Sequence, residues 1–339
     1  MARPLLLLTA AATILGIGLY LNALPSGHEP AAEPVVHELP ITREEATLRV
    51  RYCGNGDLAA DPATRRLVVV IHGDARNACE YASWTIAAAH AAGALDETLV
   101  VAPHFLSDSD DEARREDTLY WTSGGWKTGS LSRMEPYDRP WQLSSFAVVD
   151  EIIEQAQQNV PSLEEVVVAG HSAGGQLVQR YAAATRISGP VRFVVANPSS
   201  YLYLDDRRWQ DSELRDLDGD ELEACPTYDE YKYGLNERFG YFGELSRSDI
   251  RGRYGVRRVD YLLGADDTDQ EGGNIDESCE AAWQGRHRLE RGLFFVAALG
   301  ELYGDEVYDR HRLTIVPDVG HDAEDMLLSP EGQDALFGR

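Results

Sequence analysis

The chain has 339 residues, 43% of them hydrophobic, so it can bury a large core. Its 57 aspartate and glutamate residues outnumber 31 lysine and arginine residues, giving a formal net charge of −26. An acidic surface repels phosphate groups, which argues against nucleic acid and anionic membrane surfaces as partners. The same charge predicts that neutral substrates are favoured over anionic ones. Nearly all basic residues are arginines, since the only lysines are Lys127 and Lys232.

The first segment, 1–24, is hydrophobic and predicts a signal peptide or a membrane anchor. Arg3 precedes an uncharged run from Leu5 to Leu21, which is long for a signal-peptide core and slightly short for a membrane span. A poor cleavage site slightly favours the uncleaved anchor. In either case we expect an extracytoplasmic protein, secreted or held at the membrane by this segment. Residues 25–46 contain four prolines and are expected to form a flexible tether.

Beyond the tether, strand-like apolar runs alternate with helical patterns. Strands are expected at 47–52, 66–71, 98–103, 166–169, 191–196, 259–263 and 313–316, and helices at 84–92, 145–159, 174–185 and 279–302. This alternation predicts an α/β protein with a mostly parallel, twisted sheet covered by helices on both faces. One domain is expected over 47–339, with a cap-like excursion at about 197–258.

The segment EEVVVAGHSAGG, Glu164 to Gly175, runs from an apolar strand straight into glycines. Ser172 is the centre of a G-x-S-x-G pattern between this strand and a helix. Gly170 and Gly174 remove Cβ atoms that would collide in a sharp turn, and the helix N-terminus favours developing negative charge. The pattern alone also occurs by chance, but its place between strand and helix predicts that Ser172 is a nucleophile.

This arrangement resembles the nucleophile elbow of the α/β-hydrolase superfamily. Within that superfamily, the chain resembles exported esterases and polyhydroxyalkanoate-depolymerase-like serine hydrolases from about residue 48 to its end. The resemblance implies a catalytic triad in the order serine, acid, histidine, with an oxyanion hole formed by two backbone amides. It implies no cofactor.

His321 is the expected base, because it lies in the loop PDVGHDAEDM after the last strand, where the superfamily keeps its histidine. His287 and His311 are expected to be solvated, since they lie in charged stretches. The G-x-x-D pattern of the superfamily selects Asp267 as the acid. Four other residues stay open as the acid, two in the same loop and two after the preceding strand: Asp266, Asp269, Asp205 and Asp206.

The expected oxyanion-hole donors are the backbone amides of Ala173 and Asp74. Asp74 follows the strand that ends at His72, and His72 is expected to be structural rather than a second base. Three aromatic residues follow strands near the expected site and are candidates for substrate binding, although ordinary packing explains them equally well: Trp121, Trp126 and Tyr201.

Four cysteines fit an exported protein in an oxidising compartment. Sequential pairing closes the shortest loops and predicts the disulfides Cys53–Cys79 and Cys225–Cys279. The spacing of cysteines and histidines does not match a zinc site, and the acidic turn RDLDGDELE does not match the register of a calcium loop. No metal is therefore expected.

These features predict a serine hydrolase that cleaves small or polymeric carboxylic esters through an acyl-enzyme. Two other functions stay open: a serine peptidase or acyltransferase with the same triad, and a non-catalytic binding protein on a hydrolase scaffold. Esters are preferred over peptides because an alcohol leaves readily, whereas an amide needs extended binding to hold the scissile bond.

Overall fold

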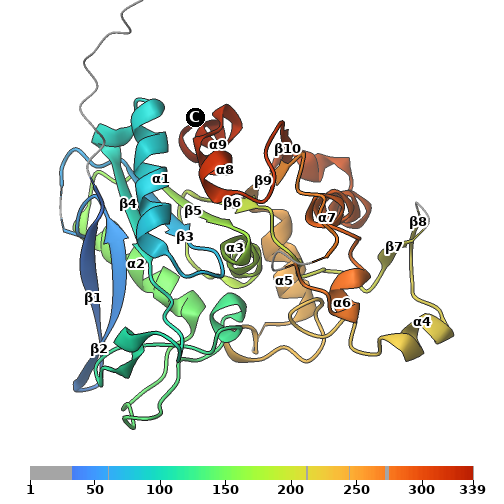
Figure 1. Ribbon diagram of the computed structural model, residues 1–339, viewed down its shortest axis with the longest axis horizontal. Coiled ribbons are helices and arrows are strands. Elements are labelled where there is room, and N and C mark those ends of the chain that lie inside the picture. Colours follow the sequence, from blue (N-terminus) through green and yellow to red (C-terminus); the bar gives the residue numbers. More distant parts are fainter. Residues whose placement is uncertain (1–32, 60, 211–212, 244, 272–274, 339) are drawn as a thin grey trace, which may run out of the picture. The chain divides into compact units, whose positions relative to one another are not determined.

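The computed structural model describes residues 33–338 except 60, 211–212, 244 and 272–274 (Figure 1). The expected signal or anchor segment, 1–24, lies outside the described residues, as does the first part of the expected tether. Within the described part, no helix combines the length and apolar character needed to cross a bilayer.

The elements alternate along the chain much as the sequence predicts. The strands are β1 (Val35–Arg43), β2 (Ala46–Gly54), β3 (Arg66–Ile71), β4 (Thr98–Pro103), β5 (Glu165–His171), β6 (Val191–Ala196), β7 (Arg208–Gln210), β8 (Glu213–Arg215), β9 (Arg258–Gly264) and β10 (His311–Val316). The α-helices are α1 (Ala78–Ala91), α2 (Ser145–Asn159), α3 (Ala173–Ala184), α4 (Gly219–Ala224), α5 (Arg247–Gly255), α6 (Cys279–Ala282), α7 (Arg288–Tyr303), α8 (Ala323–Leu328) and α9 (Pro330–Phe337).

Eight strands form one sheet in the order β1-β2-β4-β3-β5-β6-β9-β10 (Figure 1). Within this sheet, β4, β3, β5, β6, β9 and β10 pair in parallel, whereas β1 pairs antiparallel with β2, and β2 with β4. Strands β7 and β8 form a separate antiparallel pair. The carboxyl ends of the parallel strands therefore lie along one edge, where loops from separate parts of the chain meet. This confirms the predicted α/β fold with a mostly parallel sheet.

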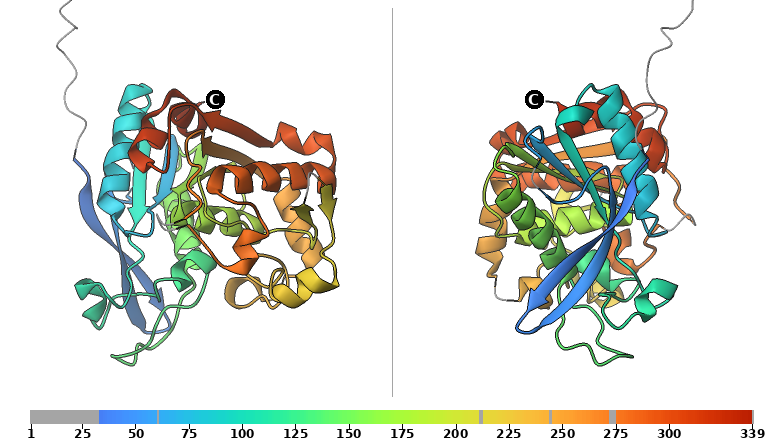
Figure 2. Two further views of the ribbon diagram at one scale, coloured as in Figure 1. Left: turned by 45° about the vertical axis from the view of Figure 1, so that its right-hand side comes forward. Right: turned by 90° about the vertical axis from the view of Figure 1, so that its left-hand side faces the viewer.

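Helices cover both faces of the sheet (Figure 2). Alternate residues of β3 show the division: Val69 packs in the cluster that includes α2, α3 and α7, and Val70 packs in the cluster that includes α1, α8 and α9. Because both faces are covered, every residue of β3, β4 and β6 is buried. This explains why these strands are continuous apolar runs in the sequence.

The structure differs from the predicted elements at several places. Helix α1 begins at Ala78 rather than at 84, and six short elements have no predicted counterpart: β7, β8, α4, α5, α8 and α9. The expected tether contains β1, an edge strand in which only Leu39 and Ile41 are buried and which tolerates Pro40 because one side needs no partner. The helix expected over 279–302 is two helices, since the chain turns between them at Gly285, which has a positive φ of 137°.

Both predicted disulfides are confirmed. Cys53 of β2 bonds Cys79 in the first turn of α1, with Cα atoms 5.0 Å apart. Cys225, just after α4, bonds Cys279 at the start of α6, with Cα atoms 5.9 Å apart. The second disulfide therefore joins the excursion to the segment that follows β9.

The prediction that His311 is solvated is wrong, because His311 begins β10 and is fully buried. Its Nε2 lies 2.9 Å from the carbonyl oxygen of Tyr254, and its Nδ1 lies 3.0 Å from the hydroxyl of Tyr261. A ring that donates from Nε2 and accepts at Nδ1 is neutral. Burial accordingly lowers the pKa of His311 to about 4.

Candidate active site

Ser172 lies between β5 and α3 with φ 57° and ψ −118°, a backbone conformation that non-glycine residues rarely adopt. Hydrogen bonds on both sides hold this turn. The amide of Ser172 donates to the carbonyl of Ala196 at 2.9 Å, and the amide of Gln176 donates to the carbonyl of Ser172 at 3.0 Å. The turn therefore has the strained geometry that the elbow motif predicts.

The glycines of the motif are required by close backbone contacts. A Cβ on Gly174 would lie 2.2 Å from the carbonyl oxygen of Ile71, and a Cβ on Gly170 would lie 2.5 Å from the carbonyl carbon of Gly174. Neither neighbour is a flexible side-chain end, so the backbone itself would have to move. Helix α3 packs this closely on β3 because Gly174 lacks a side chain, and on β5 because Gly170 lacks one.

We predict that Gly174→Ala lowers the free energy of unfolding by about 1–3 kcal/mol, the usual cost of forcing an extra carbon into a packed site. Gly219→Ala is the control, because nothing lies within 4 Å of a Cβ placed there. Urea unfolding of both variants checks the prediction. Equal stability of the two variants would contradict this role for Gly174.

Three side chains from separate loops form a hydrogen-bonded chain at the carboxyl edge of the sheet. The Oγ of Ser172 lies 2.9 Å from Nε2 of His321, in the loop after β10. Nδ1 of His321 lies 2.8 Å from Oδ2 of Asp267, in the loop after β9. Asp266 and Asp269 are both exposed, so the contacts favour Asp267 among the candidate acids.

Asp267 is held by contacts that the sequence analysis did not anticipate. Its Oδ1 lies 3.4 Å from a terminal nitrogen of Arg288, and both side chains are 1% exposed. Its carbonyl accepts a hydrogen bond from the amide of Leu289 at 3.2 Å, so the loop is tied to the start of α7. Burial lowers the pKa of Arg288, and the charge of Asp267 opposes that effect. No sequence motif identifies Arg288, because its approach depends on how α7 packs.

The ring of His171 packs against the ring of His321. The two rings are 4.7 Å apart between centroids and inclined by 35°. Burial first, and then the nearby His321 and Arg288, lower the pKa of His171 well below its usual value. The ring next to His321 is therefore neutral and does not repel an imidazolium there. Asn197 ties the loops of Asp267 and His321 together by donating to the carbonyl of Gly320 at 3.2 Å and accepting from the amide of Gly264 at 2.9 Å.

Ser172 lines a cavity of about 250 Å³, and both residues of the expected oxyanion hole, Ala173 and Asp74, line it too. Ala173 is the first residue of α3, and Asp74 follows β3. Lys127 contacts the carboxylate of Asp74 at 2.7 Å, and Arg76 donates to its carbonyl at 3.2 Å. Two cations thus hold the loop that carries Asp74. The cavity lining is mostly polar, formed by Asp74, Lys127, Ser172, Ala173, Gln176, Ser199, Lys232, Ile275 and Asp276.

The three aromatic residues predicted to bind substrate lie in the core instead. Trp121, Trp126 and Tyr201 are each 0% exposed and do not line the cavity. Trp126 stacks on Phe105 with their centroids 5.8 Å apart, and Tyr201 stacks on Phe295 at 4.6 Å. The aromatic side chains turn inward because burial of their large apolar area stabilises the loops. This corrects their predicted role as walls of the substrate pocket.

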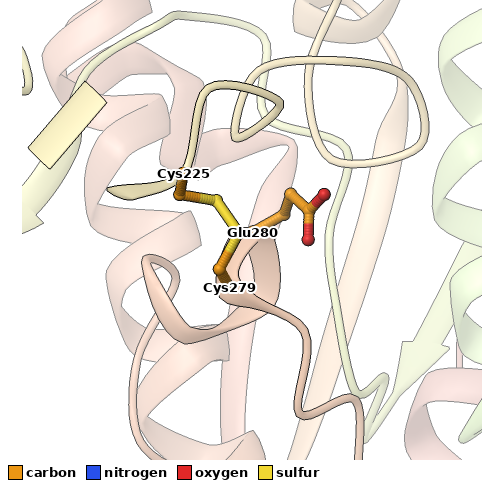
Figure 3. Close-up of side chains that lie close together, drawn as sticks. All are labelled: Cys225, Cys279 and Glu280. Atoms are coloured by element: carbon orange, nitrogen blue, oxygen red, sulfur yellow. A yellow bond between two sulfur atoms is a disulfide. The ribbon is translucent and has the colours of Figure 1, made fainter. Parts of the chain in front are cut away.

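A cluster of side chains with metal-binding atoms lies at the second disulfide: Cys225, Cys279 and Glu280 (Figure 3). Metals bind the thiolate form of cysteine, whereas these two sulfur atoms are bonded to each other. One oxygen of Glu280 accepts a hydrogen bond from the hydroxyl of Thr227 at 2.7 Å. The cluster is therefore a disulfide beside a carboxylate that already has a partner, and not a metal site.

His72 lies beneath the loop of Asp74 and is fully buried. Its Nδ1 lies 2.8 Å from the carbonyl of Gly73, and its Nε2 accepts from the amide of Phe105 at 3.0 Å. Both nitrogens have backbone partners, as expected of a structural residue. Burial lowers the pKa of His72 to about 3.

Because the pKa values of His72 and His311 are lowered in the folded chain, we predict that the protein loses stability in mild acid. In the folded chain their pKa values lie at about 3 and about 4, below the value of about 6.5 for an unfolded chain. The unfolded state therefore binds more protons below pH 6.5, so the stabilisation is complete above that pH and decreases as the pH falls. Each histidine contributes about 1.4 kcal/mol per pH unit.

Urea unfolding at pH 7, 6 and 5 measures this dependence. His311→Gln is expected to have a slope between pH 6 and pH 5 that is about 1.4 kcal/mol per pH unit shallower than that of the parent. An unchanged slope would show that His311 takes up no proton on unfolding.

Two solved structures have a similar fold over nearly the whole chain. LpqC, a poly(3-hydroxybutyrate) depolymerase from Bordetella parapertussis, is 21% identical, with a TM-score of 0.61 and coverage of 90% of this chain and 91% of the other. Poly(aspartic acid) hydrolase-1 from Sphingomonas sp. KT-1 is 24% identical, with a TM-score of 0.59 and coverage of 90% and 100%. Neither a protein-family model nor a curated protein matches the sequence. The shared architecture identifies this chain as having the α/β-hydrolase fold.

Proposed function

We propose that the chain is a serine hydrolase that cleaves carboxylic esters. The observation that carries the proposal is the continuous contact from Ser172 through His321 to Asp267, with steps of 2.9 and 2.8 Å. These are hydrogen-bond distances between a nucleophile, a base and an acid in their usual roles. The mostly parallel sheet supports the proposal, because it brings the three loops together at one edge.

In the proposed reaction, Nε2 of His321 takes the proton of the Ser172 hydroxyl as Oγ attacks the carbonyl carbon of the ester. Asp267 keeps the ring in the tautomer with its proton on Nδ1 and stabilises the imidazolium that forms. The amides of Ala173 and Asp74 receive the negative charge on the carbonyl oxygen. His321 then protonates the departing alcohol, and water attacks the acyl-enzyme by the same route to release the acid and free Ser172.

The size of the cavity favours a small ester over an extended peptide. A volume of about 250 Å³ lies just below the range of about 300–1,000 Å³ that is typical of small-molecule sites. Peptide cleavage needs many contacts along the substrate, because a poor leaving group must be held in place for attack.

The acceptor of the acyl group distinguishes ester cleavage from acyl transfer. Water accepts the acyl group in ester cleavage, whereas an added alcohol competes with water for the acyl-enzyme in acyl transfer.

The test compares a short neutral ester with the amide of the same acyl group. We expect measurable hydrolysis of 4-nitrophenyl butyrate and little or no hydrolysis of the matched 4-nitroanilide. Comparable values of kcat/KM for the two would favour the peptidase alternative. A butyryl product formed mainly on an added alcohol would favour the acyltransferase, and the absence of turnover would favour the binding-protein alternative.

We further propose that the protein acts outside the cytoplasm. Two disulfides among the described residues support an oxidising compartment. The proposed leader or anchor, 1–24, lies outside the part of the chain that the structure describes. N-terminal sequencing of the mature protein from the native cell tests this segment. A first residue after the segment 1–24 indicates a cleaved leader, and a first residue at or near Met1 indicates a retained anchor.

A further inference from the structure

Basic side chains gather at the cavity of Ser172, although the chain as a whole is strongly acidic. The sequence contains two lysines, Lys127 and Lys232, and both line the cavity of Ser172. They come from segments about one hundred residues apart, one in the short 3-10 helix Gly125–Thr128 and the other in the excursion after β6. A general acidic surface does not account for this placement.

Both ammonium groups are held in position at the cavity wall. Nζ of Lys127 lies 2.7 Å from a carboxylate oxygen of Asp74, and Nζ of Lys232 lies 3.2 Å from a carboxylate oxygen of Asp276. Their side chains remain 20% and 31% exposed. Each ammonium has three N–H donors, so an ion pair with one carboxylate leaves donors for a second.

Two buried arginines add positive charge behind this wall. Arg180 is 0% exposed and donates to Oε1 of Gln176 at 3.2 Å and to the carbonyl of Lys127 at 3.1 Å. Arg291 is 3% exposed and donates to the carbonyl of Ser199. These contacts to cavity residues are with neutral acceptors, which do not cancel the charge of a guanidinium.

The cations outnumber the carboxylates only when the residues behind the lining are counted. The lining itself is balanced, with two lysines, Lys127 and Lys232, and two carboxylates, Asp74 and Asp276. Behind it, Arg180 and Arg291 add two positive charges, whereas the buried carboxylate of Asp267 is paired with Arg288. Burial alone would raise the pKa of Asp276, yet Lys232 and hydrogen bonds from Ser278 and Tyr233 hold it well below its usual value. Asp276 is therefore ionised, and an excess of positive charge remains after both carboxylates are counted.

We propose that Lys127 and Lys232 bind a carboxylate on the substrate, so that the enzyme prefers esters that carry a free carboxylate close to the scissile bond. This inference rests on the proposed ester hydrolysis and names its substrate class. It replaces the expectation, drawn from the net charge, that neutral esters are preferred. The rest of the acidic surface lies in solvent, where salt screens charges beyond about 10 Å, whereas charges in a partly enclosed cavity are screened much less.

The test uses two pairs of esters in which a carboxylate replaces a branched alkyl group of similar shape. Monoethyl succinate is compared with ethyl 4-methylpentanoate, and acetoxyacetate with isobutyl acetate, so that the acyl and alcohol sides are tested separately. We expect kcat/KM to favour the charged ester at least tenfold in one pair. Equal or faster hydrolysis of the neutral ester in both pairs would overturn the inference.

The variant that isolates the ammonium is Lys232→Met combined with Asp276→Asn, because it leaves the net charge unchanged. The preference for the charged ester is expected to fall about tenfold, as for the loss of one charge-assisted hydrogen bond. Lys127→Met with Asp74→Asn is expected to act in the same direction. A preference that survives in both variants would overturn the assignment to the lysines.

Arg65→Met combined with Glu164→Gln is the matched control, because it too removes an ion pair and leaves the net charge unchanged. Both residues are exposed and lie before β3 and β5, at the end of the sheet opposite the site. We expect both members of each pair to react as in the parent.

Calorimetry separates this inference from the proposed reaction. Ser172→Ala protein is titrated with monoethyl succinate and with ethyl 4-methylpentanoate, and tighter binding of the charged ester supports the inference without any turnover. Tighter binding of the charged ester to Ser172→Ala protein, with no hydrolysis of either ester by the parent protein, would reject only the proposed function. Equal binding of the two esters, together with hydrolysis that favours the neutral ones, would reject only the charge preference.

Discussion

Replacement of Ser172 by alanine is expected to lower kcat for an activated ester by about 10⁶. The reason is that the proposed attack comes from Ser172 Oγ, which lies 2.9 Å from Nε2 of His321. Residual catalysis of about 10³ to 10⁴ over water is expected from the oxyanion hole and binding alone. Steady-state hydrolysis of 4-nitrophenyl butyrate by purified protein measures the loss.

The control for this loss is Ser188→Ala, which changes an exposed serine in the loop before β6. Its activity and the unfolding midpoints of both variants are expected to equal those of the parent within error. Parent-like activity of folded Ser172→Ala would contradict the assignment of the nucleophile. Loss of folding in that variant would be visible in its unfolding curve.

Replacement of Asp267 by asparagine is expected to lower kcat by about 10⁴. An asparagine amide donates toward Nδ1 of His321, which favours the tautomer that carries its proton on Nε2 and faces Ser172 with a donor. The proton of Ser172 then has no acceptor. The same change removes the carboxylate that faces Arg288, so stability is also expected to decrease.

Asp266→Asn and Asp269→Asn are the matched controls, because they change exposed carboxylates in the same loop. Both are expected to retain parent-like kcat. A loss of about 10⁴ in either control, with activity retained in Asp267→Asn, would transfer the role of the acid to that residue. Measurement of the pH profile with each variant separates an effect on His321 from a general loss of folded protein.

The central strands and the serine turn were predictable because their causes are local. The buried strands at 66–71, 98–103 and 191–196 are apolar throughout, and the structure gives them the same bounds. The glycines beside Ser172 report a close backbone approach that any residue with a Cβ would block. His321 and Asp267 were not predictable from local pattern alone. They were assigned from the order of serine, acid and histidine in the superfamily that the sequence resembles.

The residues that escaped prediction depend on long-range packing. The edge strand β1 buries only two side chains and contains a proline, so its sequence resembles a linker. Trp126 and Tyr201 are aromatic residues in loops near the expected site, as is typical of residues that bind substrate. They nevertheless point into the core, because tertiary contacts decide the direction of their side chains. Lys232 reaches the cavity from the excursion, and only the rarity of lysine in this chain distinguishes it in the sequence.

The most direct test of the account is covalent labelling of the protein with a fluorophosphonate, followed by mass spectrometry of its peptides. This reagent reacts with a serine whose oxygen is activated by a base. We predict one adduct, on Ser172, and a large decrease in its rate of formation in His321→Ala and Asp267→Asn. An unlabelled Ser172 in folded parent protein, or labelling that proceeds at the parent rate in both variants, would contradict the catalytic triad.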